Sequence, residues 1–132
     1  MEFADTDMAG IVHFSRFFVL MESVEHEFLR SLGLSVVMER DGGHLSWPRL
    51  TTSCEYLHPA RFEDVLDISL KVLRVGARSL TYAFSFARGE VEVARGQLKV
   101  ACCMCSPGGR MKAVPIPGFI VEKIEEAPSS HG

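Results

Sequence analysis

The feature that most constrains the fold is a change in the hydrophobic period along the chain. From residue 14 to residue 32, large apolar residues recur at steps of three and four, with charged residues between them. This is the pattern of an amphipathic helix with a wide buried face. Gly33 follows the last apolar position and can adopt the left-handed conformation that ends helices. The sequence therefore predicts one long helix that ends at about residue 32.

Beyond residue 50 the apolar and polar residues alternate, which is typical of half-buried strands. The alternating segments are residues 50–56, 66–72, 80–86 and 91–105, with a shorter one at 111–114. Short connections at Gly76 and Gly89 make neighbouring segments antiparallel. The order is a short strand, one long helix and a meander of strands. We predict an α+β fold in which the sheet wraps the helix, because both need the same core.

Length and composition fit one domain. The chain has 132 residues, of which 47% are hydrophobic and 23% charged, as in ordinary soluble globular proteins. The last six residues, APSSHG, have the composition of a frayed terminus. We expect a single domain over residues 1–126 and a flexible tail at 127–132.

Charge and hydropathy argue against two classes of partner. The net charge is −3, with 14 basic against 17 acidic residues, so no basic stripe is available for nucleic acid. No apolar run reaches the roughly 18 residues that span a bilayer, and the start MEFADTD lacks the features of a signal peptide. We expect a cytoplasmic protein that binds neither nucleic acid nor membranes.

Four cysteines raise the question of a metal site. Three of them, Cys102, Cys103 and Cys105, lie in an alternating apolar segment, and Cys54 lies in another. No second Cys or His pair stands at zinc-finger spacing. We interpret the cysteines as small buried hydrophobes and expect no metal and no cofactor.

The most informative motif is EFADTDMAGIVHF, residues 2–14. It resembles the N-terminal signature of the 4-hydroxybenzoyl-CoA thioesterase family of hot-dog proteins, in which D-x-D is followed by an A-G-[IV]-V turn and an aromatic residue that opens the long helix. The likeness continues through EHEFLRSLGLS and CEYLHPARFEDVLDI. Relatives carry more residues before Glu2, and they place Tyr or His where this chain has Phe14. The resemblance implies the hot-dog fold, and it implies no side-chain role for position 14.

The resemblance also implies an activity, the hydrolysis of a small or aromatic acyl-CoA to the free acid and coenzyme A. This reaction needs an activated oxygen nucleophile and fixed donors for the oxyanion. The family likeness points to Asp7 as the catalytic carboxylate, either as a nucleophile or as a general base on water. Without the resemblance, Asp5 and Asp7 would be interpreted as turn or cap residues.

The remaining catalytic candidates surround the start of the helix. Free N–H groups near Phe14 would polarise the thioester oxygen, which requires no particular side chain. Gly10 would let the backbone approach the substrate closely. His13 is either a proton shuttle or an ordinary polar residue at a helix start.

The family likeness further implies an assembly. Hot-dog subunits join their sheets edge to edge, which places the active site between subunits, so we expect at least a homodimer and favour a homotetramer. The acyl pocket would be lined by helix aromatics of one subunit and by Trp47, Thr51 and Ser53 of the other. Arg61 is a candidate for the phosphates of coenzyme A, as are Arg49 and Lys99, although each alone is more simply interpreted as a surface residue.

Two alternatives remain open. The polar residues Glu22, Glu25, His26 and Glu27 could include a catalytic acid of the helix, but we favour a solvated face because Asp7 already fills that role. The chain could also be a non-catalytic hot-dog module that binds acyl-CoA. A hot-dog hydratase would need a D-x-N-P-x-H-like string, which the sequence lacks.

Overall fold

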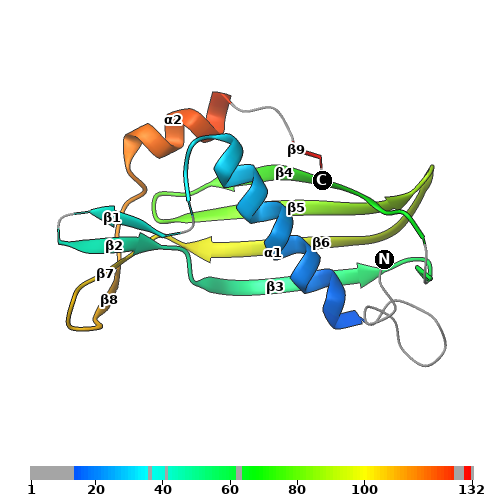
Figure 1. Cartoon of the computed structure of the whole chain (residues 1–132), viewed down its shortest axis with the longest axis horizontal. Helices are drawn as coiled ribbons and strands as arrows, with labels where there is room; N and C mark the ends of the chain where they lie inside the picture. The colour runs from blue at the N-terminus through cyan, green and yellow to red at the C-terminus, as the bar shows by residue number, and fades with distance from the viewer. Residues whose placement is uncertain (1–13, 36, 41, 62–63, 127–129, 132) are drawn as a thin grey trace.

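The computed structural model describes residues 14–35, 37–40, 42–61, 64–126 and 130–131. Two sheets and two helices make up this part of the chain (Figure 1). In chain order the elements are α1 Phe14–Ser31, β1 Met38–Arg40, β2 Gly43–Ser46, β3 Arg49–Tyr56, β4 Asp67–Val75, β5 Ser79–Arg88, β6 Val91–Ala101, β7 Cys103–Cys105, β8 Met111–Ala113, α2 Gly118–Glu126 and β9 Ser130–His131.

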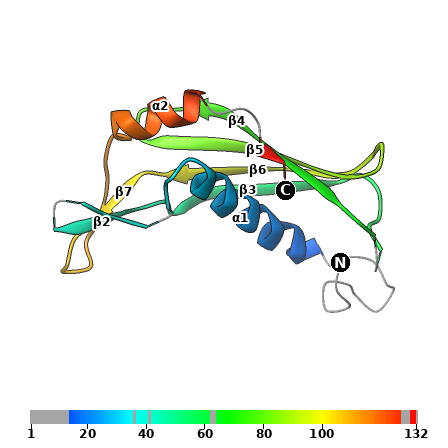
Figure 2. The same cartoon turned by 45° about the horizontal axis from the view of Figure 1, so that its top comes forward.

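Helix α1 lies where the periodicity predicts it. Its buried face packs on the five-stranded sheet, which has the strand order β3-β6-β5-β4-β9 (Figure 2). The helix ends with Gly33 at a φ of +75°, and the N–H groups of Gly33 and Leu34 donate to the carbonyls of Arg30 and Leu29. This is the Schellman arrangement that glycine favours. The predicted α+β fold, with one long helix on an antiparallel sheet, is confirmed.

The five-stranded sheet separates its side chains cleanly between two faces. In β5, Tyr82, Phe84 and Phe86 are buried on the face that packs on α1, and the residues between them lie on the opposite face. We call this opposite face the outer face. Gly96 in β6 allows the helix to pack closely, because a Cβ atom there would lie 2.6 Å from Sδ of Met21.

The prediction of one strand over residues 91–105 is wrong. The segment contains two strands, β6 and β7, that belong to different sheets and are separated at Cys102. The N–H of Cys102 donates to the carbonyl of Arg78, and its carbonyl accepts from the N–H of Val114. The chain therefore leaves the five-stranded sheet and enters a second sheet with the order β1-β2-β7-β8.

Two further elements were not predicted. The hairpin of β1 and β2 lies between the predicted helix and the first alternating segment. Helix α2 follows Pro117, and it buries Ile120 and Ile124 against the core. Neither described helix is long and apolar enough to cross a membrane. Cytoplasmic location and the domain limits stay predictions, although two residues of the expected tail form β9 against β4.

Candidate active site and the surfaces around it

The start of α1 is the part of the predicted catalytic centre that the structure describes. Phe14 is the first residue of the helix, so its N–H belongs to the first turn, where backbone donors have no partner within the helix. Asp7, Gly10 and His13 lie outside the described residues. Their roles, and the oxyanion role of the Phe14 amide, stay predictions.

A small crevice lies between α1 and the sheet, beginning one turn after Phe14. Its volume is about 200 Å³. Three elements line it: α1 with Phe18, Met21 and Glu22, β3 with Arg49 and Thr52, and β6 with Leu98. The volume is below the roughly 300–1,000 Å³ of sites for drug-sized ligands, so the crevice suits a short or single-ring group.

A buried ion pair lies beside this crevice. The Glu25 side chain is 0% exposed, and its Oε1 lies 2.5 Å from Nη2 of Arg49. The second guanidinium nitrogen, Nη1, donates to Oε2 of Glu25 at 3.3 Å and to the carbonyl of Trp47 at 2.9 Å. The expectation of a solvated position is therefore wrong for Glu25. The carboxylate is buried because the apolar stripe of α1 is wide enough to include it and because Arg49 compensates its charge.

Electrostatics around the pair are set mainly by burial. Removal from water raises the pKa of Glu25, and the nearby Arg49 guanidinium opposes that rise. His26 approaches on the same helix, with Nε2 3.8 Å from Oε1 of Glu25. Glu22 approaches Arg49 at 3.6 Å from a mostly exposed position. Arg49 is thus paired with two carboxylates. The structure gives no support to its predicted contact with the phosphates of coenzyme A.

An aromatic cluster packs beside the first turns of α1. The ring of Phe17 meets Tyr56 and Phe86 edge to face, with centroids 5.4 and 5.1 Å away. Burial and the neighbouring Cys54 thiol raise the pKa of Tyr56 to about 12, and burial also raises the pKa of Cys54. Both groups therefore stay protonated near neutral pH, and neither supplies a ready nucleophile.

The predicted lining residues fall in different places. Trp47 is buried in the core. Thr51 pairs with Lys99 and Ser53 with Gln97, so both side chains lie on the outer face, away from α1. Within one chain it is Thr52 that reaches the crevice. The predicted role of Thr51 and Ser53 in lining the acyl pocket stays a prediction.

Arg61 lies in the connection between β3 and β4, five residues after the end of β3. Its N–H donates to Oδ2 of Asp64 at 2.7 Å, and Arg88 donates to the same oxygen at 3.1 Å. These contacts, with the Arg61 N–H first, lower the pKa of Asp64. The Arg61 side chain is exposed, and its predicted contact with coenzyme A stays a prediction.

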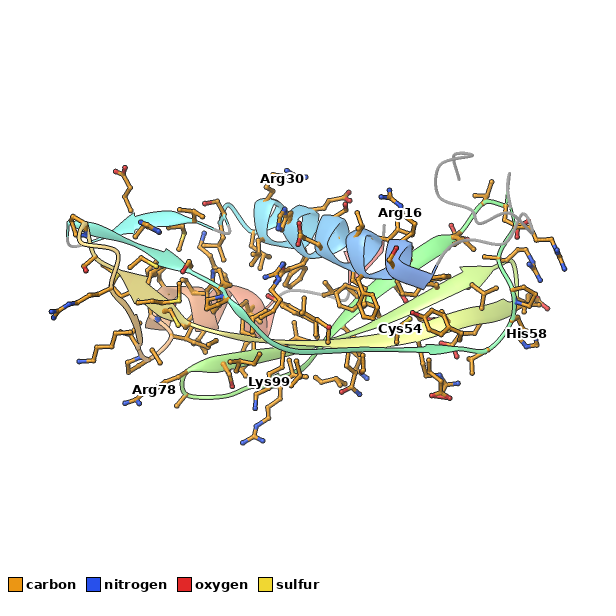
Figure 3. All side chains as sticks on the ribbon, turned by 90° about the horizontal axis from the view of Figure 1, so that it is seen from below. Arg16, Arg30, Cys54, His58, Arg78 and Lys99 are labelled. Atoms are coloured by element: carbon orange, nitrogen blue, oxygen red, sulfur yellow. The ribbon has the colours of Figure 1, made fainter. Side chains whose placement is uncertain are left out.

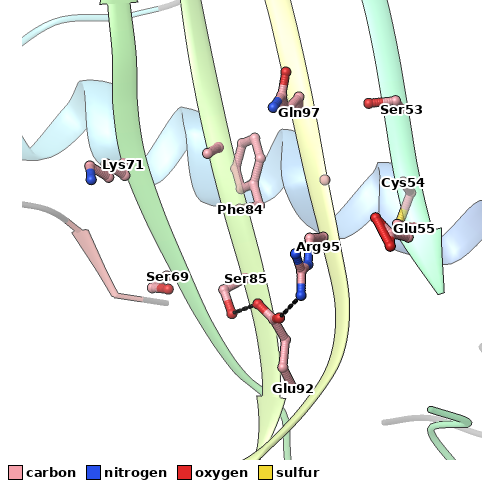
Figure 4. Close-up of a pocket in the computed structure, with 12 residues that line it drawn as sticks. Ser53, Cys54, Glu55, Ser69, Lys71, Phe84, Ser85, Glu92, Arg95 and Gln97 are labelled. Carbon is pink, nitrogen blue, oxygen red and sulfur yellow. Dashed lines mark hydrogen bonds and ion pairs between the residues drawn. The ribbon is translucent and has the colours of Figure 1, made fainter. Parts of the chain in front are cut away.

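The outer face contains a second, larger hollow of about 650 Å³ (Figure 4). Its walls come from β3, β4, β5 and β6, and polar side chains from these strands dominate it. Glu92 accepts from Oγ of Ser85 at 2.7 Å and pairs with Arg95 at 2.9 Å. Lys99 projects from the side of the sheet opposite α1 (Figure 3). Across the part of the chain that the structure describes, no three His, Cys, Asp or Glu residues are placed to hold a metal.

Comparison with known proteins places this fold and motif among related chains. The family model described as the thioesterase-like superfamily matches residues 1–124. A protein of Aquifex aeolicus, named as a candidate esterase, is 32% identical over 126 residues, which are 96% of this chain and 94% of that protein. The acyl-CoA thioesterase YbgC of Haemophilus influenzae is 25% identical over 115 residues, 87% of this chain and 82% of that one.

A solved structure shows the same fold. A hypothetical protein from Thermus thermophilus superposes with a TM-score of 0.81 at 26% identity, covering 95% of this chain and 92% of that one. The predicted hot-dog fold is confirmed.

Proposed function

Because the chain belongs to the thioesterase-like superfamily, we propose that it hydrolyses a small or aromatic acyl-CoA thioester to the free acid and coenzyme A. The predicted class of enzyme, a thioester hydrolase, is confirmed by the relatives described above. The acyl group and the residues that act on it are proposals.

The proposed chemistry uses a carboxylate and the start of α1. In hydrolysis, a water oxygen becomes bonded to the carbonyl carbon, the carbon–sulfur bond breaks, and the thiolate of coenzyme A leaves and takes up a proton. Asp7 either attacks the carbonyl itself, forming a mixed anhydride that water then cleaves, or removes a proton from the attacking water. The Phe14 amide stabilises the oxyanion. His13 is suited to deliver the proton to the thiolate.

The observation that carries the proposal is the position at which α1 begins. The helix starts at Phe14, the last residue of the 2–14 motif. The first-turn N–H groups and the positive end of the helix dipole therefore begin seven residues after Asp7 in the chain. The crevice beside Phe18 lies one turn further along and offers space for the acyl group. Gly10 would allow the thioester to approach the backbone.

The proposed site is shared between two subunits. Strand β3 is an edge of the five-stranded sheet, and all of its eight residues except Cys54 are exposed. A long exposed edge strand is a ready template for pairing with another strand. We propose that β3 pairs with the β3 of a second copy, so that the crevice between α1 and β3 of each subunit lies beside the junction of the two sheets; Thr51 and Ser53 of β3 would then lie close to that junction. Trp47 would support that strand from the core.

The crevice supports the proposed size of the acyl group, and Arg61 supports the proposed contact with coenzyme A. The crevice suits a short chain or a single aromatic ring, and its lining is apolar except for Glu22, Arg49 and Thr52. Arg61 is exposed five residues after the end of β3 and is the proposed contact for the phosphates of coenzyme A.

A panel of thioesters tests the proposal. Purified protein is incubated with acetyl-, hexanoyl-, benzoyl- and 4-hydroxybenzoyl-CoA, and release of free thiol is followed. We expect turnover of at least one member, with the single-ring acyl groups preferred over longer chains. Binding of these compounds without any release of thiol would contradict the proposal and favour the non-catalytic acyl-CoA-binding module. The same assay with these acyl groups attached to acyl carrier protein determines whether the protein acts on coenzyme A thioesters or on acyl carrier protein thioesters.

A further inference from the structure

Gly96 leaves a gap in the face of the five-stranded sheet that packs on α1. One row of paired residues crosses this face: Cys54 of β3 pairs with Gly96 of β6, and Gly96 pairs with Phe84 of β5. Cys54 and Phe84 lie on the strands at either side of β6 (Figure 4). The sheet itself contributes no side chain to the middle of this row. A glycine inside a strand often marks the close approach of another group.

The side chain of Met21 fills this gap. A Cβ atom at Gly96 would lie 2.6 Å from Sδ of Met21 and 3.2 Å from its Cε. The end of the Met21 side chain therefore occupies the place that a side chain of residue 96 would take. Met21 is 1% exposed and Phe84 is 2% exposed, so solvent does not enter the gap. The group that fills it is an unbranched thioether, which adapts to irregular spaces.

The same Met21 side chain is part of the wall of the crevice. The floor of the crevice is a row of the sheet in which Thr52 of β3 pairs with Leu98 of β6. This row and the row of Gly96 are neighbours on one face, because residues two apart in a strand point to the same side. Met21 thus separates the crevice from the space over Gly96.

We propose that Met21 sets the size of the acyl group that the enzyme accepts, because it closes the side of the crevice that faces Gly96. This inference rests on the proposed function, which places the acyl group in the crevice. With Met21 in place, the crevice of about 200 Å³ takes a short chain or a single ring. Without that side chain, the crevice continues over Gly96 toward Phe84.

The walls of this extension favour an apolar chain. Leu98 and Phe84 are buried apolar side chains, and a cavity with such walls stays dry and accepts an apolar group. A hydrophobic pocket distinguishes chains that differ by one methylene by about 10–200-fold. A long acyl chain therefore gains most from removal of the Met21 side chain. An acetyl group is too short to reach the extension and gains nothing.

Four variants test the proposal. Met21→Ala opens the extension, whereas Met21→Leu keeps the volume of the side chain nearly constant. Met21→Ala combined with Gly96→Ala places a methyl group in the opened space, where Met21 no longer obstructs it. Ile120→Ala is the matched control, because Ile120 is equally buried but lies in α2 and not in the crevice wall. It reports what the loss of a buried side chain does by itself. Circular dichroism verifies that each variant is folded.

Two measurements are made on each protein. The first is kcat/KM for acetyl-, benzoyl- and decanoyl-CoA. The second is the Kd of S-benzyl-CoA and S-decyl-CoA, thioethers that cannot be hydrolysed, by calorimetry. We expect the decanoyl-to-benzoyl ratio of kcat/KM to rise at least about tenfold in Met21→Ala, with a matching change in the ratio of Kd values. The ratio should stay near that of the parent in Met21→Leu and Ile120→Ala, and it should fall back toward the parent in the double variant.

The binding measurement separates this inference from the proposed function. A parent that binds both thioethers but releases no thiol from the thioesters would contradict the proposed function, and the Kd ratio of Met21→Ala would still decide the role of Met21. An unchanged ratio in a folded Met21→Ala would overturn the inference and show that longer chains leave the crevice by its open side. An equal rise in Ile120→Ala would also overturn it, because lost stability would then be the cause. A parent that binds neither thioether would overturn both proposals.

Discussion

The carboxylate of Glu25 and the guanidinium of Arg49 form a two-pronged ion pair that ties α1 to strand β3. The pair joins Oε1 to Nη2 at 2.5 Å and Oε2 to Nη1 at 3.3 Å. Glu25 is fully buried, and Arg49 is 30% exposed at the edge of the sheet. Removal of one partner leaves the other with an uncompensated charge, whereas removal of both leaves an apolar contact. The helix that begins at Phe14 is thus fixed to the strand proposed to meet the second subunit.

Single and double substitutions measure this coupling. We expect Arg49→Met to lower the free energy of unfolding by about 3 kcal/mol, since it leaves the Glu25 carboxylate buried without a cation. Glu25→Met together with Arg49→Met should recover most of that loss. Urea denaturation of the three proteins checks this, with Glu27→Met as a control at an exposed position of α1. A double variant less stable than Arg49→Met would contradict the account.

The pH dependence of stability reports the ionisation of Glu25. Burial raises its folded-state pKa above the ordinary value of 4.5. A raised folded pKa means that the folded state binds the proton more tightly than the unfolded state does. The resulting stability is fully present below about pH 4.5 and is lost as the pH rises through the folded pKa. The unfolding free energy of the parent minus that of Glu25→Gln should therefore fall with rising pH. A difference that grows would mean that Arg49 outweighs burial.

Gly96 tests how closely α1 packs on the sheet. A Cβ atom at this position would lie 2.6 Å from Sδ of Met21 and 3.0 Å from the carbonyl oxygen of Ser53. Met21 is only 1% exposed, so it has little room to move. We expect Gly96→Ala to lower the unfolding free energy by about 1–3 kcal/mol, as overpacking of a core does. Gly108→Ala is the control, because nothing lies within 4 Å of its Cβ position. Equal midpoints in urea for both variants would contradict the close approach.

Substitutions at Phe14, the first residue of α1, test the proposal that its backbone N–H stabilises the oxyanion. Phe14→Tyr and Phe14→Leu both keep the N–H and should retain most of the turnover. Phe14→Pro removes the donor, while proline still suits the first helical turn. We expect kcat to fall by about 100-fold or more, the usual loss for one oxyanion donor. Circular dichroism and sedimentation accompany the assay. An inactive Phe14→Leu would show that the ring itself shapes the site, and a folded, active Phe14→Pro would place the donor elsewhere.

Local sequence patterns predicted the structural features that depend on contacts between residues close in sequence. The three- and four-residue steps and Gly33 are sufficient to define α1 and its end, because a helix is stabilised by contacts within a few residues. The alternation in β5 likewise predicts which side chains meet the helix. The division at Cys102 could not be seen in this way. Alternation continues across it, and only hydrogen bonds to Arg78 and Val114 mark the change of sheet.

The candidate site likewise has features that are local in sequence and features that depend on residues far apart in sequence. The motif of residues 2–14 and the helix start at Phe14 are local features, and the sequence contains both. The burial of Glu25 is not local, since the charge that permits it comes from Arg49, 24 residues further along. The crevice also needs three elements from different parts of the chain. We predicted Thr51 and Ser53 for the lining, but the alternation within 50–56 puts Thr52 on the strand face opposite to Thr51, and this signal would have favoured Thr52.

The most direct measurement of the central claim is the kcat of Asp7→Asn on the thioester that the parent hydrolyses best. Asn keeps the shape of the side chain but can neither attack the carbonyl as a carboxylate nor accept a proton from water. We expect kcat to fall by at least about 100-fold with fold and oligomeric state unchanged, while Asp5→Asn, the matched control, keeps most of the parent rate. A folded Asp7→Asn that turns over at the parent rate would remove Asp7 from the reaction and contradict the proposed mechanism.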